Sequence, residues 1–323
     1  MSPAITDVAG VLVGHAHDET ALTGCTAILT VDGAVGGVDV RGGGPGTRET
    51  DLLNPVANVS VVHAITLCGG SAFGLAAATG VVDWLQERDI GYPTRIRKVP
   101  IVPAAVIYDL GLGRADRWPD AALGYAACEA AGVAVAEGCV GAGMGASVGK
   151  LLGIAGAVKS GIGTWSETLA DGTVVGALAV CNAVGDVYEE VSGRILAGAR
   201  DPSGKGFADS MALLRTAQFQ AALPTAPASE NTTLAVVATD ARLTKAEVSK
   251  MAQMAQDALP RTIRPIHTPF DGDTVFALST GKRSGPPLVV LGAIAADVLA
   301  RALERCVRMA TSIGGLPAAR DLA

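Results

Sequence analysis

The segment ENTTLAVV, residues 230–237, joins a polar connector to an apolar run. The connector, residues 221–231, is rich in Ala and Pro, whereas the residues after Thr232 are mostly apolar and often β-branched. This composition predicts a surface loop that leads directly into a buried strand at 232–239. A second interpretation is that the chain is cut before Thr232, which would make this residue a new N-terminus.

A threonine at an N-terminus carries a nucleophile and a base on one residue. Its hydroxyl attacks a carbonyl, and its α-amine, with a pKa of ~7.7–8.0 in model peptides, accepts the proton at neutral pH. The β-branched side chain restricts χ1 and so holds the hydroxyl in one orientation. The bond between Asn231 and Thr232 is therefore the candidate cleavage site, and Thr232 is the candidate nucleophile.

The composition is that of a folded chain with a large apolar core. Of the 323 residues, 49% are hydrophobic and 17% are charged. The net charge of −6 and the lack of a basic run argue against a nucleic-acid partner. Six cysteines and four histidines are scattered without the spacing of zinc ligands. We therefore expect buried thiols, no metal and no cofactor.

The N-terminus and the longest apolar run predict a cytoplasmic protein. The first residues, MSPA, lack the basic and apolar regions of a signal peptide. The apolar run at 72–82 is too short to cross a bilayer and is closed by Asp83. We therefore expect no membrane partner.

Strand and helix patterns are interleaved along the chain. Runs at 159–167 and 173–182 predict a β-hairpin across Asp171-Gly172, a favoured two-residue turn. Because hairpins occur among the helices, the pattern favours an α/β fold with layers around a mixed sheet over a doubly wound parallel sheet. We expect a single domain over residues 1–323.

Capping signals mark two of the predicted helices. Ser71 precedes the apolar run at 72–87 and is the predicted N-cap of a helix there, rather than an exposed nucleophile. Thr244 begins a capping box, with Glu247 three residues later, and predicts a second helix start. The pattern at 288–312 predicts a long helix near the end of the chain.

Two glycine-rich stretches adjoin a basic side chain: Arg41 begins the first, and Lys150 follows the second. The run RGGGPG at 41–46 is either a tight structural loop near a site or a nest that binds an anion through backbone N–H groups. The run at 141–149 leads into Lys150, whose neighbours Leu151 and Leu152 are apolar. A lysine in such surroundings is either a solvated surface residue or one that lends charge to a site or loses its proton.

An amide and two acids complete the candidate site. Asn182 ends a predicted buried strand. It is either a turn residue or a side-chain donor to an oxyanion. In acyl transfer, such a donor raises the reaction rate by ~10²–10³-fold. Asp271 and Asp273 flank a glycine, either as a turn or as acids that orient an N-terminal amine and pair with Lys150. Their spacing is not that of an EF-hand calcium loop. Together these groups match the requirements of acyl transfer.

Six segments, taken in order, resemble those of the DmpA-type peptidases. This family includes L-aminopeptidase/D-amidases, β-peptidyl aminopeptidases and nylon-oligomer hydrolases. The resemblance covers nearly the whole chain. The segments are RGGGPG (41–46), GGSAFGL (69–75), AVIYD (105–109), GAGMGASVGK (141–150), NTT (231–233) and DGDT (271–274).

The resemblance implies an αββα sandwich, similar to that of the N-terminal-nucleophile hydrolases but differently connected. It also implies that the precursor cuts itself into an α subunit, residues 1–231, and a β subunit, residues 232–323. The αβ units would assemble as homo-oligomers, often tetramers. The implied activity is that of an aminopeptidase or amidase that cleaves small peptides or amino-acid amides.

The resemblance also assigns roles to individual residues. Tyr108 and Asn182 would line the oxyanion side, and Lys150 would support the nucleophile. Asp271 and Asp273 would hold the amine and the lysine. Several relatives have Ser and Glu at these two acidic positions, so this chain is similar to the threonine-nucleophile, nylon-hydrolase subtype. The implied site residues are Thr232, Lys150, Asn182, Asp271, Asp273 and Tyr108.

Two other functions remain open. An acyltransferase of the ornithine-acetyltransferase sort would also cut itself before a threonine, but would pass the acyl group to an amine instead of water. A non-enzymatic protein would use its glycine-rich loops to bind an anion. It would show no fragmentation, and its ligand binding would survive replacement of Thr232.

Overall fold

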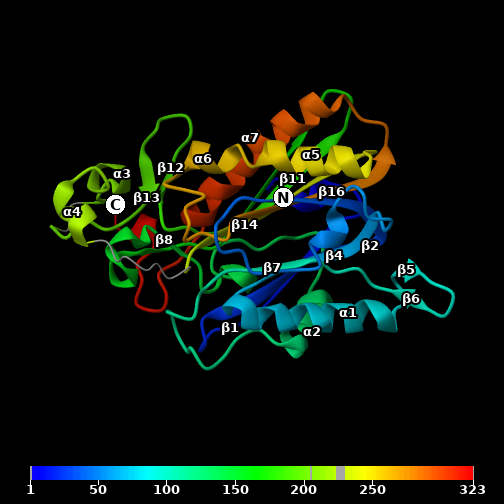
Figure 1. Cartoon of the computed structure of the whole chain (residues 1–323), viewed down its shortest axis with the longest axis horizontal. Helices are drawn as coiled ribbons and strands as arrows, with labels where there is room; N and C mark the ends of the chain where they lie inside the picture. Colours follow the sequence, from blue (N-terminus) through cyan, green and yellow to red (C-terminus); the bar gives the residue numbers. More distant parts are fainter. Residues whose placement is uncertain (1, 204–205, 223–229, 323) are drawn as a thin grey trace.

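The computed structural model describes residues 2–203, 206–222 and 230–322 (Figure 1). Most of the predicted connector at 221–231 lies outside the described residues. The helices are α1 (Ala77–Glu87), α2 (Ala121–Glu129), α3 (Ser210–Leu213), α4 (Ala217–Ala222), α5 (Lys245–Ala255), α6 (Ala258–Thr262) and α7 (Leu288–Arg308). The strands are β1 (Leu12–Asp18), β2 (Thr23–Val40), β3 (Thr47–Arg48), β4 (Val61–Cys68), β5 (Tyr92–Pro93), β6 (Lys98–Val99), β7 (Ala104–Val106), β8 (Ser147–Val148), β9 (Val158–Lys159), β10 (Ile162–Thr168), β11 (Val174–Asn182), β12 (Asp186–Tyr188), β13 (Ile195–Ala197), β14 (Thr232–Ala241), β15 (Ile263–Arg264) and β16 (Thr274–Arg283).

One large sheet runs through the described residues in the order β10-β11-β14-β16-β2-β4-β7-β3, with β1 also paired to β2. The 18-residue strand β2 joins two regions of this sheet. Residues 23–29 pair with β1 and β4, and residues 35–40 pair with β16. The register with β4 shifts between Leu29 and Ala34, as expected where a bulge bends a strand. The sheet therefore forms two layers (Figure 1).

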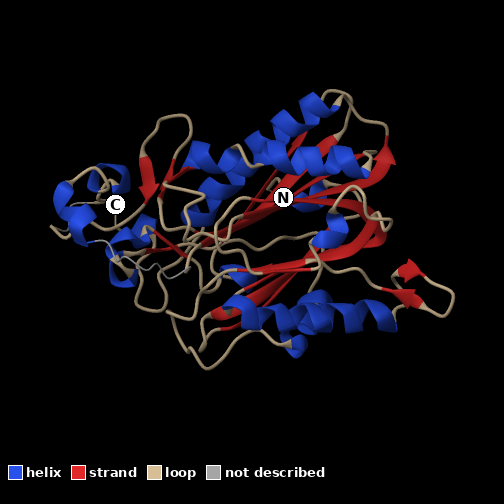
Figure 2. Cartoon of the chain, in the orientation of Figure 1, coloured by secondary structure: helices blue, strands red, loops and turns tan. Residues whose placement is uncertain are grey.

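Two helical layers enclose the two strand layers (Figure 2). Helices α5, α6 and α7 lie on one side, and α1 and α2 lie on the other (Figure 1). Three apolar clusters fill the spaces: one under α5 and α7, one between the strand layers and one against α1 and α2. This is the αββα sandwich that the family resemblance implies, and its sheet is mixed, as the sequence pattern predicts.

Strand β14 lies at the centre of this arrangement, and all ten of its residues are buried. Alternate side chains point to opposite faces of a strand. Accordingly, Leu234 and Val236 pack into the cluster between the strand layers, and Ala235 and Val237 pack under α5 and α7. A continuous apolar run is what a strand covered on both faces requires. The predicted strand at 232–239 is confirmed.

Several other predicted elements are confirmed. β10 and β11 form the antiparallel hairpin that the Asp171-Gly172 turn predicts. Thr244 accepts a hydrogen bond from the backbone N–H of Glu247, in a complete capping box at the start of α5. The long C-terminal helix forms as α7 and ends at Arg308.

The predicted cap at Ser71 is wrong. Ser71 makes no capping hydrogen bond from its side chain and has a left-handed φ of 51°, inside a 3₁₀ turn at Ser71–Ala76. The α-helix itself begins at Ala77. The backbone N–H of Ser71 instead donates to the carbonyl of Ile107, so pairing with a distant segment decides the local conformation.

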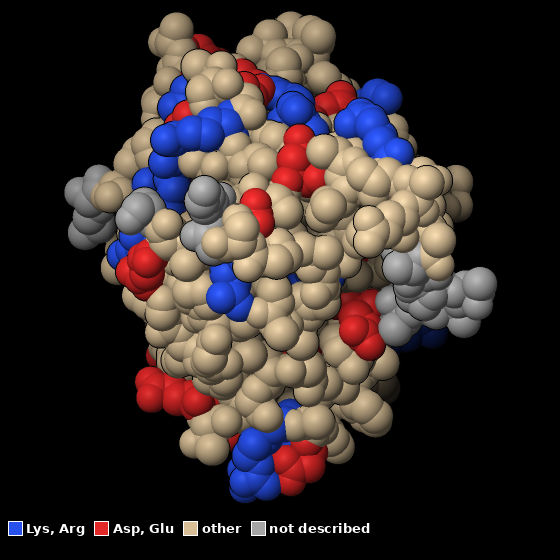
Figure 3. Space-filling model, turned by 90° about the vertical axis from the view of Figure 1, so that its left-hand side faces the viewer, with Lys and Arg blue, Asp and Glu red and all other residues tan. Residues whose placement is uncertain are grey.

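Charged side chains are mixed rather than segregated on the face shown in Figure 3, where Asp and Glu lie among Lys and Arg. Within the part of the chain that the structure describes, no helix has both the length and the apolar character needed to cross a bilayer.

Candidate active site

Thr232 is the first residue of β14 and is 4% exposed. The structure is that of the uncut chain, in which Asn231 and Thr232 are linked. The Oγ1 of Thr232 donates a hydrogen bond to the carbonyl oxygen of Asn231 at 2.5 Å. The predicted nucleophile therefore lies directly beside the carbonyl of the predicted cleavage site.

A second donor contacts the same carbonyl. The backbone N–H of Gly272 donates to the oxygen of Asn231 at 2.9 Å. A Cβ at Gly272 would lie 2.9 Å from the Oγ1 of Thr232, so only glycine allows the backbone to approach the hydroxyl this closely. A backbone N–H held against a carbonyl stabilises the negative charge that develops on its oxygen when the carbon is attacked.

Asn182 ends β11 and lies opposite Thr232 in the antiparallel ladder. Its Oδ1 accepts hydrogen bonds from the backbone N–H of Ser147 at 3.1 Å and from the Nζ of Lys150 at 2.9 Å. Its Nδ2 donates to the carbonyl oxygen of Tyr108 at 2.9 Å. Because the N–H of Ser147 can only donate, these contacts fix which end of the amide is the donor. An amide nitrogen has two hydrogens, so a second donor is available to an oxyanion.

Lys150 donates from its Nζ to three oxygens: the carbonyl of Asn182 at 2.8 Å, the Oδ1 of Asn182 at 2.9 Å and the carbonyl of Glu230 at 3.3 Å. Burial lowers the pKa of Lys150 to about 7, against the opposing effect of the Asp271 carboxylate. The lysine therefore titrates near neutral pH, and it can supply charge or exchange a proton at the site.

The position of Lys150 depends on the glycine before it. Gly149 has a left-handed φ of 70°, and a Cβ there would lie 2.1 Å from the backbone of Gly198. The backbone N–H of Lys150 donates to the carbonyl of Val184, two residues beyond the end of β11. The glycine-rich run thus brings the lysine onto the end of the strand that carries Asn182.

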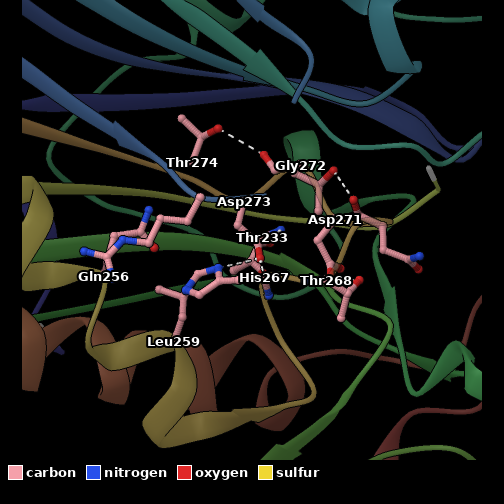
Figure 4. A network of polar contacts seen from close by, with 12 residues as sticks. Thr233, Gln256, Leu259, His267, Thr268, Asp271, Gly272, Asp273 and Thr274 are labelled. Carbon is pink, nitrogen blue, oxygen red and sulfur yellow. Dashed lines mark hydrogen bonds and ion pairs between the residues drawn. The ribbon is translucent and has the colours of Figure 1, made fainter. Parts of the chain in front are cut away.

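The two acids lie on a loop before β16. The Oδ1 of Asp273 accepts from the backbone N–H of Thr233 at 2.7 Å, and its Oδ2 accepts from the backbone N–H of His267 at 3.1 Å and contacts the ring Nδ1 of His267 at 2.9 Å. The contact with Thr233 ties the loop to the start of β14. Figure 4 shows His267 and Thr233 gathered around the segment that carries Asp271 and Asp273.

Asp271 is fully buried. Its Oδ2 accepts from the backbone N–H of Thr268 at 2.8 Å and from the Thr268 hydroxyl at 2.5 Å. Its Oδ1 is buried and has no hydrogen-bond partner among the described residues. Burial, with a smaller contribution from the Asp273 charge, raises the pKa of Asp271 to about 6. The backbone of Asp271 forms an isolated parallel bridge with Asn231, the residue that precedes Thr232.

The glycine-rich loop at 41–46 supports this acidic loop. The backbone N–H groups of Arg41, Gly43 and Gly44 donate to the carbonyls of Asp273, Thr268 and Asp271 respectively. A Cβ at Gly42 would lie 2.2 Å from the carbonyl oxygen of Asp271. Because these N–H groups are already paired within the chain, the structural interpretation of the loop is favoured over an anion nest.

A cavity of about 220 Å³ opens beside the scissile bond. Tyr108 lies on its wall, as do Lys150 and Asn231. Among the described residues, Tyr108 is joined to the other site residues through its backbone carbonyl, which accepts a hydrogen bond from the Nδ2 of Asn182. Its predicted role on the oxyanion side stays a prediction. A larger cavity of about 390 Å³, between β13 and α7, is lined by none of the predicted site residues.

The structure thus brings the six predicted positions to one end of β14. The predicted ion pair between Lys150 and the two acids is not among the contacts of the described residues, because the Nζ of Lys150 donates to Asn182 and to the carbonyl of Glu230 instead. The structure also adds residues that the sequence reasoning missed: His267, Thr268, Ser147 and the backbone of Gly272. His267 and Thr268 lie within six residues of Asp273 in the segment HTPFDGD, which was a usable signal. Ser147 and Gly272 act through backbone N–H groups, which no side-chain motif reveals. Among the described residues, no group of three or more His, Cys, Asp or Glu side chains is placed to bind a metal.

The burial of Lys150 has a testable consequence for stability. Because its folded pKa of about 7 lies below its ordinary value, the unfolded chain binds a proton that the folded chain lacks between about pH 7 and 10.5. The free energy of unfolding should therefore rise with pH across this window, by at most about 1.4 kcal/mol per pH unit for this one group. In the Thr232→Ala background, Lys150→Met should remove this part of the slope in urea titrations at pH 7, 8 and 9.

Lys250→Met is the matched control, because Lys250 is exposed on α5. It should leave the pH dependence of the urea midpoint unchanged. Equal slopes for the parent and the Lys150→Met protein would contradict the depressed pKa.

The sequence profile of peptidase family S58 matches residues 3–320. An uncharacterised aminopeptidase of Mycobacterium tuberculosis is 45% identical over an aligned length of 346. The alignment covers 99% of this chain and 97% of the relative. A 6-aminohexanoate-oligomer endohydrolase of Kocuria sp. is 34% identical over 306 residues, which cover 91% of this chain and 82% of the relative.

Two solved structures share the fold. The L-aminopeptidase D-Ala-esterase/amidase of Ochrobactrum anthropi, described as a variant of the Ntn hydrolase fold, superposes with a TM-score of 0.72 at 21% identity, over 98% of this chain and 89% of that chain. A β-aminopeptidase of a Burkholderia species gives a TM-score of 0.70 at 23% identity, over 100% and 92% of the two chains. The match along the full chain and the identities to the curated relatives show that this protein is a hydrolase of peptide or amide bonds and belongs to peptidase family S58.

Proposed function

We propose that this hydrolase matures by cutting itself between Asn231 and Thr232, and that the freed Thr232 is its nucleophile. The observation that carries the proposal is the placement of the Thr232 hydroxyl beside the Asn231 carbonyl, with the Gly272 N–H on the same oxygen. The site also provides a lysine that titrates near neutral pH and an oriented side-chain amide.

Maturation proceeds by an N-to-O acyl shift. The Oγ1 of Thr232 forms a bond to the carbonyl carbon of Asn231, the bond from that carbon to the Thr232 nitrogen breaks, and the hydroxyl proton ends on the nitrogen. Water then attacks the ester, giving a carboxylate on Asn231 and restoring the hydroxyl. The products are residues 1–231 and 232–323.

The substrate reaction repeats this chemistry with the freed amine as base. The amine takes the hydroxyl proton as Oγ1 attacks the substrate carbonyl, and the tetrahedral oxyanion receives a hydrogen bond from Asn182. The amide bond breaks, the leaving amine takes the proton, and water hydrolyses the acyl-Thr ester. The unpaired Oδ1 of Asp271 provides an acceptor for the new ammonium group when it is protonated.

The two fragments should stay together as one αβ unit. In the sheet, β14 and β16 of the C-terminal fragment lie between β11 and β2 of the N-terminal fragment. Cutting one peptide bond removes none of these ladders, nor the apolar clusters that cover them. We further propose, on the family resemblance, a homotetramer of αβ units in the cytoplasm that acts on small peptides or amino-acid amides.

Intact-mass analysis of the purified protein tests the proposed maturation. We expect two species whose masses match residues 1–231 and 232–323, with Thr232 at the new N-terminus. On a native gel the two should migrate together, because the sheet interleaves them. A preparation that hydrolyses amides while the chain stays at full length would refute the proposed nucleophile.

A further inference from the structure

Lys159 is a fully buried lysine beside the glycine-rich run at 141–149, and it lies in β9. Its Nζ donates to the carbonyls of Gly143 at 3.1 Å, Ala146 at 2.8 Å and Ser160 at 2.8 Å. An ammonium group has three hydrogens, so the charged form gives one to each of these acceptors. Lysine is almost never fully buried unless it is paired, and here backbone carbonyls are the partners.

The Ala146 carbonyl connects this lysine to the proposed oxyanion donor. That carbonyl belongs to the same peptide unit as the backbone N–H of Ser147, which donates to the Oδ1 of Asn182 at 3.1 Å. The Nδ2 of Asn182 donates to the Tyr108 carbonyl and has a second hydrogen for the oxyanion. One continuous chain of hydrogen bonds therefore runs from the Nζ of Lys159, through a peptide unit, to the side-chain amide at the site.

A positive charge at the start of this chain polarises each member in the same direction. Hydrogen bonds in series strengthen one another, by about 10–30% per bond. The charge draws electrons toward the Ala146 carbonyl oxygen, which makes the Ser147 N–H a stronger donor to Asn182. The amide hydrogens of Asn182 become stronger donors in turn. The lysine also fixes the plane of the peptide unit that orients this amide.

Pairing between β8 and β9 holds the same peptide unit independently of the lysine side chain. Ser147 lies opposite Lys159 in this antiparallel pair. The backbone N–H of Ser160 donates to the Ala146 carbonyl at 3.0 Å. Removal of the lysine side chain therefore leaves the peptide unit with one of these two donors, and the effect of the charge can be measured in a folded protein.

We propose that Lys159 is a positioning residue for acyl transfer: its buried charge orients and polarises the amide of Asn182 through the peptide unit that precedes Ser147. The lysine acts on the oxyanion through Asn182 and not by direct contact. This inference rests on the proposed function, since it needs Asn182 as the donor to the substrate oxyanion.

A double-mutant cycle tests whether Lys159 and Asn182 act as one unit. Lys159→Met keeps most of the side-chain volume and removes the charge. With fully cleaved protein and Ala-p-nitroanilide at pH 7, this variant should lower kcat by about tenfold, a fraction of the cost of losing the donor itself. KM should stay within about twofold, because the oxyanion forms only after the substrate is bound. In the Asn182→Ala background, Lys159→Met should lower kcat by less than about twofold.

Lys245→Met is the matched control. The Nζ of Lys245 also donates to three backbone carbonyls, those of Leu52, Ala57 and Val59. Lys245 begins α5, which follows β14, so it lies beyond the far end of the strand that Thr232 begins. This variant should have a lower thermal unfolding midpoint and an unchanged kcat. A loss of kcat like that of Lys159→Met would show a general effect of removing a buried lysine and would overturn the inference.

The pH dependence of kcat distinguishes the charge of Lys159 from its bulk. Burial lowers the pKa of Lys159 to about 8, against smaller opposing effects of Cys139 and Asp109, the titratable groups that face it. Burial raises the pKa of Asp109 to about 6, so this carboxyl is ionised above pH 7. The ratio of kcat for the parent to kcat for Lys159→Met should therefore fall several fold from about pH 7 to about pH 9.5, because the parent loses the charge while groups common to both proteins cancel.

Lys159→Arg is a second variant, which carries the test if Lys159→Met does not mature. A guanidinium donates to the same kind of acceptor but stays charged at every pH used here. The kcat of this variant at pH 7 should stay within about threefold of the parent, and the ratio of parent to variant should again fall above about pH 8.

The outcomes distinguish failure of the inference from failure of the proposed function. If Lys159→Met lowers kcat equally with and without the Asn182 side chain, or if the kcat ratios do not change with pH, the inference is overturned while the proposed function stands. An unchanged kcat in Lys159→Met also overturns it. If Asn182→Ala hydrolyses the substrate as fast as the parent, the oxyanion role in the proposed function fails and the inference fails with it.

Discussion

Thr232→Ala should leave the chain uncut and without amidase activity. The variant lacks the hydroxyl that attacks the Asn231 carbonyl, and without scission no α-amine is released to act as base. Loss of a protease nucleophile can cost about 10⁶-fold in kcat, so turnover should fall to background. A single mass for residues 1–323 and no release of p-nitroaniline are the expected observations.

The neighbouring threonine is the matched control. Thr233→Val removes a hydroxyl of the same kind, one residue further along β14, while keeping the volume and the backbone N–H that donates to Asp273. This variant should still be cut. Thr232→Ser, which keeps a hydroxyl and an N-terminal amine, should be cut and active. Amide hydrolysis by an uncut Thr232→Ala protein would contradict the assignment of the nucleophile.

Asn182→Ala should give the second largest loss. The side-chain amide is the proposed donor to the substrate oxyanion, and removal of such a donor costs about 10²–10³-fold in kcat. The variant also removes the acceptor at Oδ1 that Ser147 and Lys150 share. We therefore expect lower kcat with little change in KM, measured on Ala-p-nitroanilide with protein that has matured to the two fragments.

Maturation distinguishes the roles of Asn182 and Gly272. In the uncut chain the Asn231 carbonyl already accepts from Thr232 and from Gly272. Self-cleavage of Asn182→Ala should therefore slow less than substrate turnover does. Equal losses in the two rates would contradict this division, and an unchanged kcat would refute the oxyanion role.

Thr164→Val controls for the general cost of removing a buried polar group. Thr164 accepts a hydrogen bond from the backbone N–H of Ile5 and donates to the carbonyl of Ala177, away from the site. The Thr164→Val variant should have a lower thermal unfolding midpoint and an unchanged kcat. Comparable kcat losses in the two variants would show that the effect of Asn182→Ala comes from the fold and not from the oxyanion.

The sequence alone was enough for features that depend on neighbouring residues. The continuous apolar run after Thr232 predicts a strand that is covered on both faces, because alternate side chains of a strand point to opposite sides, and all of β14 is buried. The Asp171-Gly172 turn fixes the hairpin of β10 and β11, and the Thr244 capping box starts α5. In each case the signal lies within a few residues of the element that it specifies.

Local signals failed where a distant segment decides the conformation. Ser71 looks like a helix cap, but its backbone pairs with Ile107 and takes a left-handed conformation. The 18-residue length of β2 likewise depends on distant partners, because β4 and β16 pair with successive parts of it. Pairing of this kind depends on residues far apart in the chain, and local propensity does not encode it.

By itself, the sequence determined which side chains could carry the chemistry and that one threonine begins a buried strand. Only the tertiary structure decided that these side chains meet. The sheet order places β14 between β11 and β16, which brings Asn182 and the acidic loop to the same end of the strand as Thr232. The tertiary structure also shows that the backbone N–H of Gly272 donates a hydrogen bond to the carbonyl oxygen of Asn231, at the proposed cleavage site. The physical reason is that strand order and close backbone approach arise from long-range packing, whereas residue type and strand character are local properties.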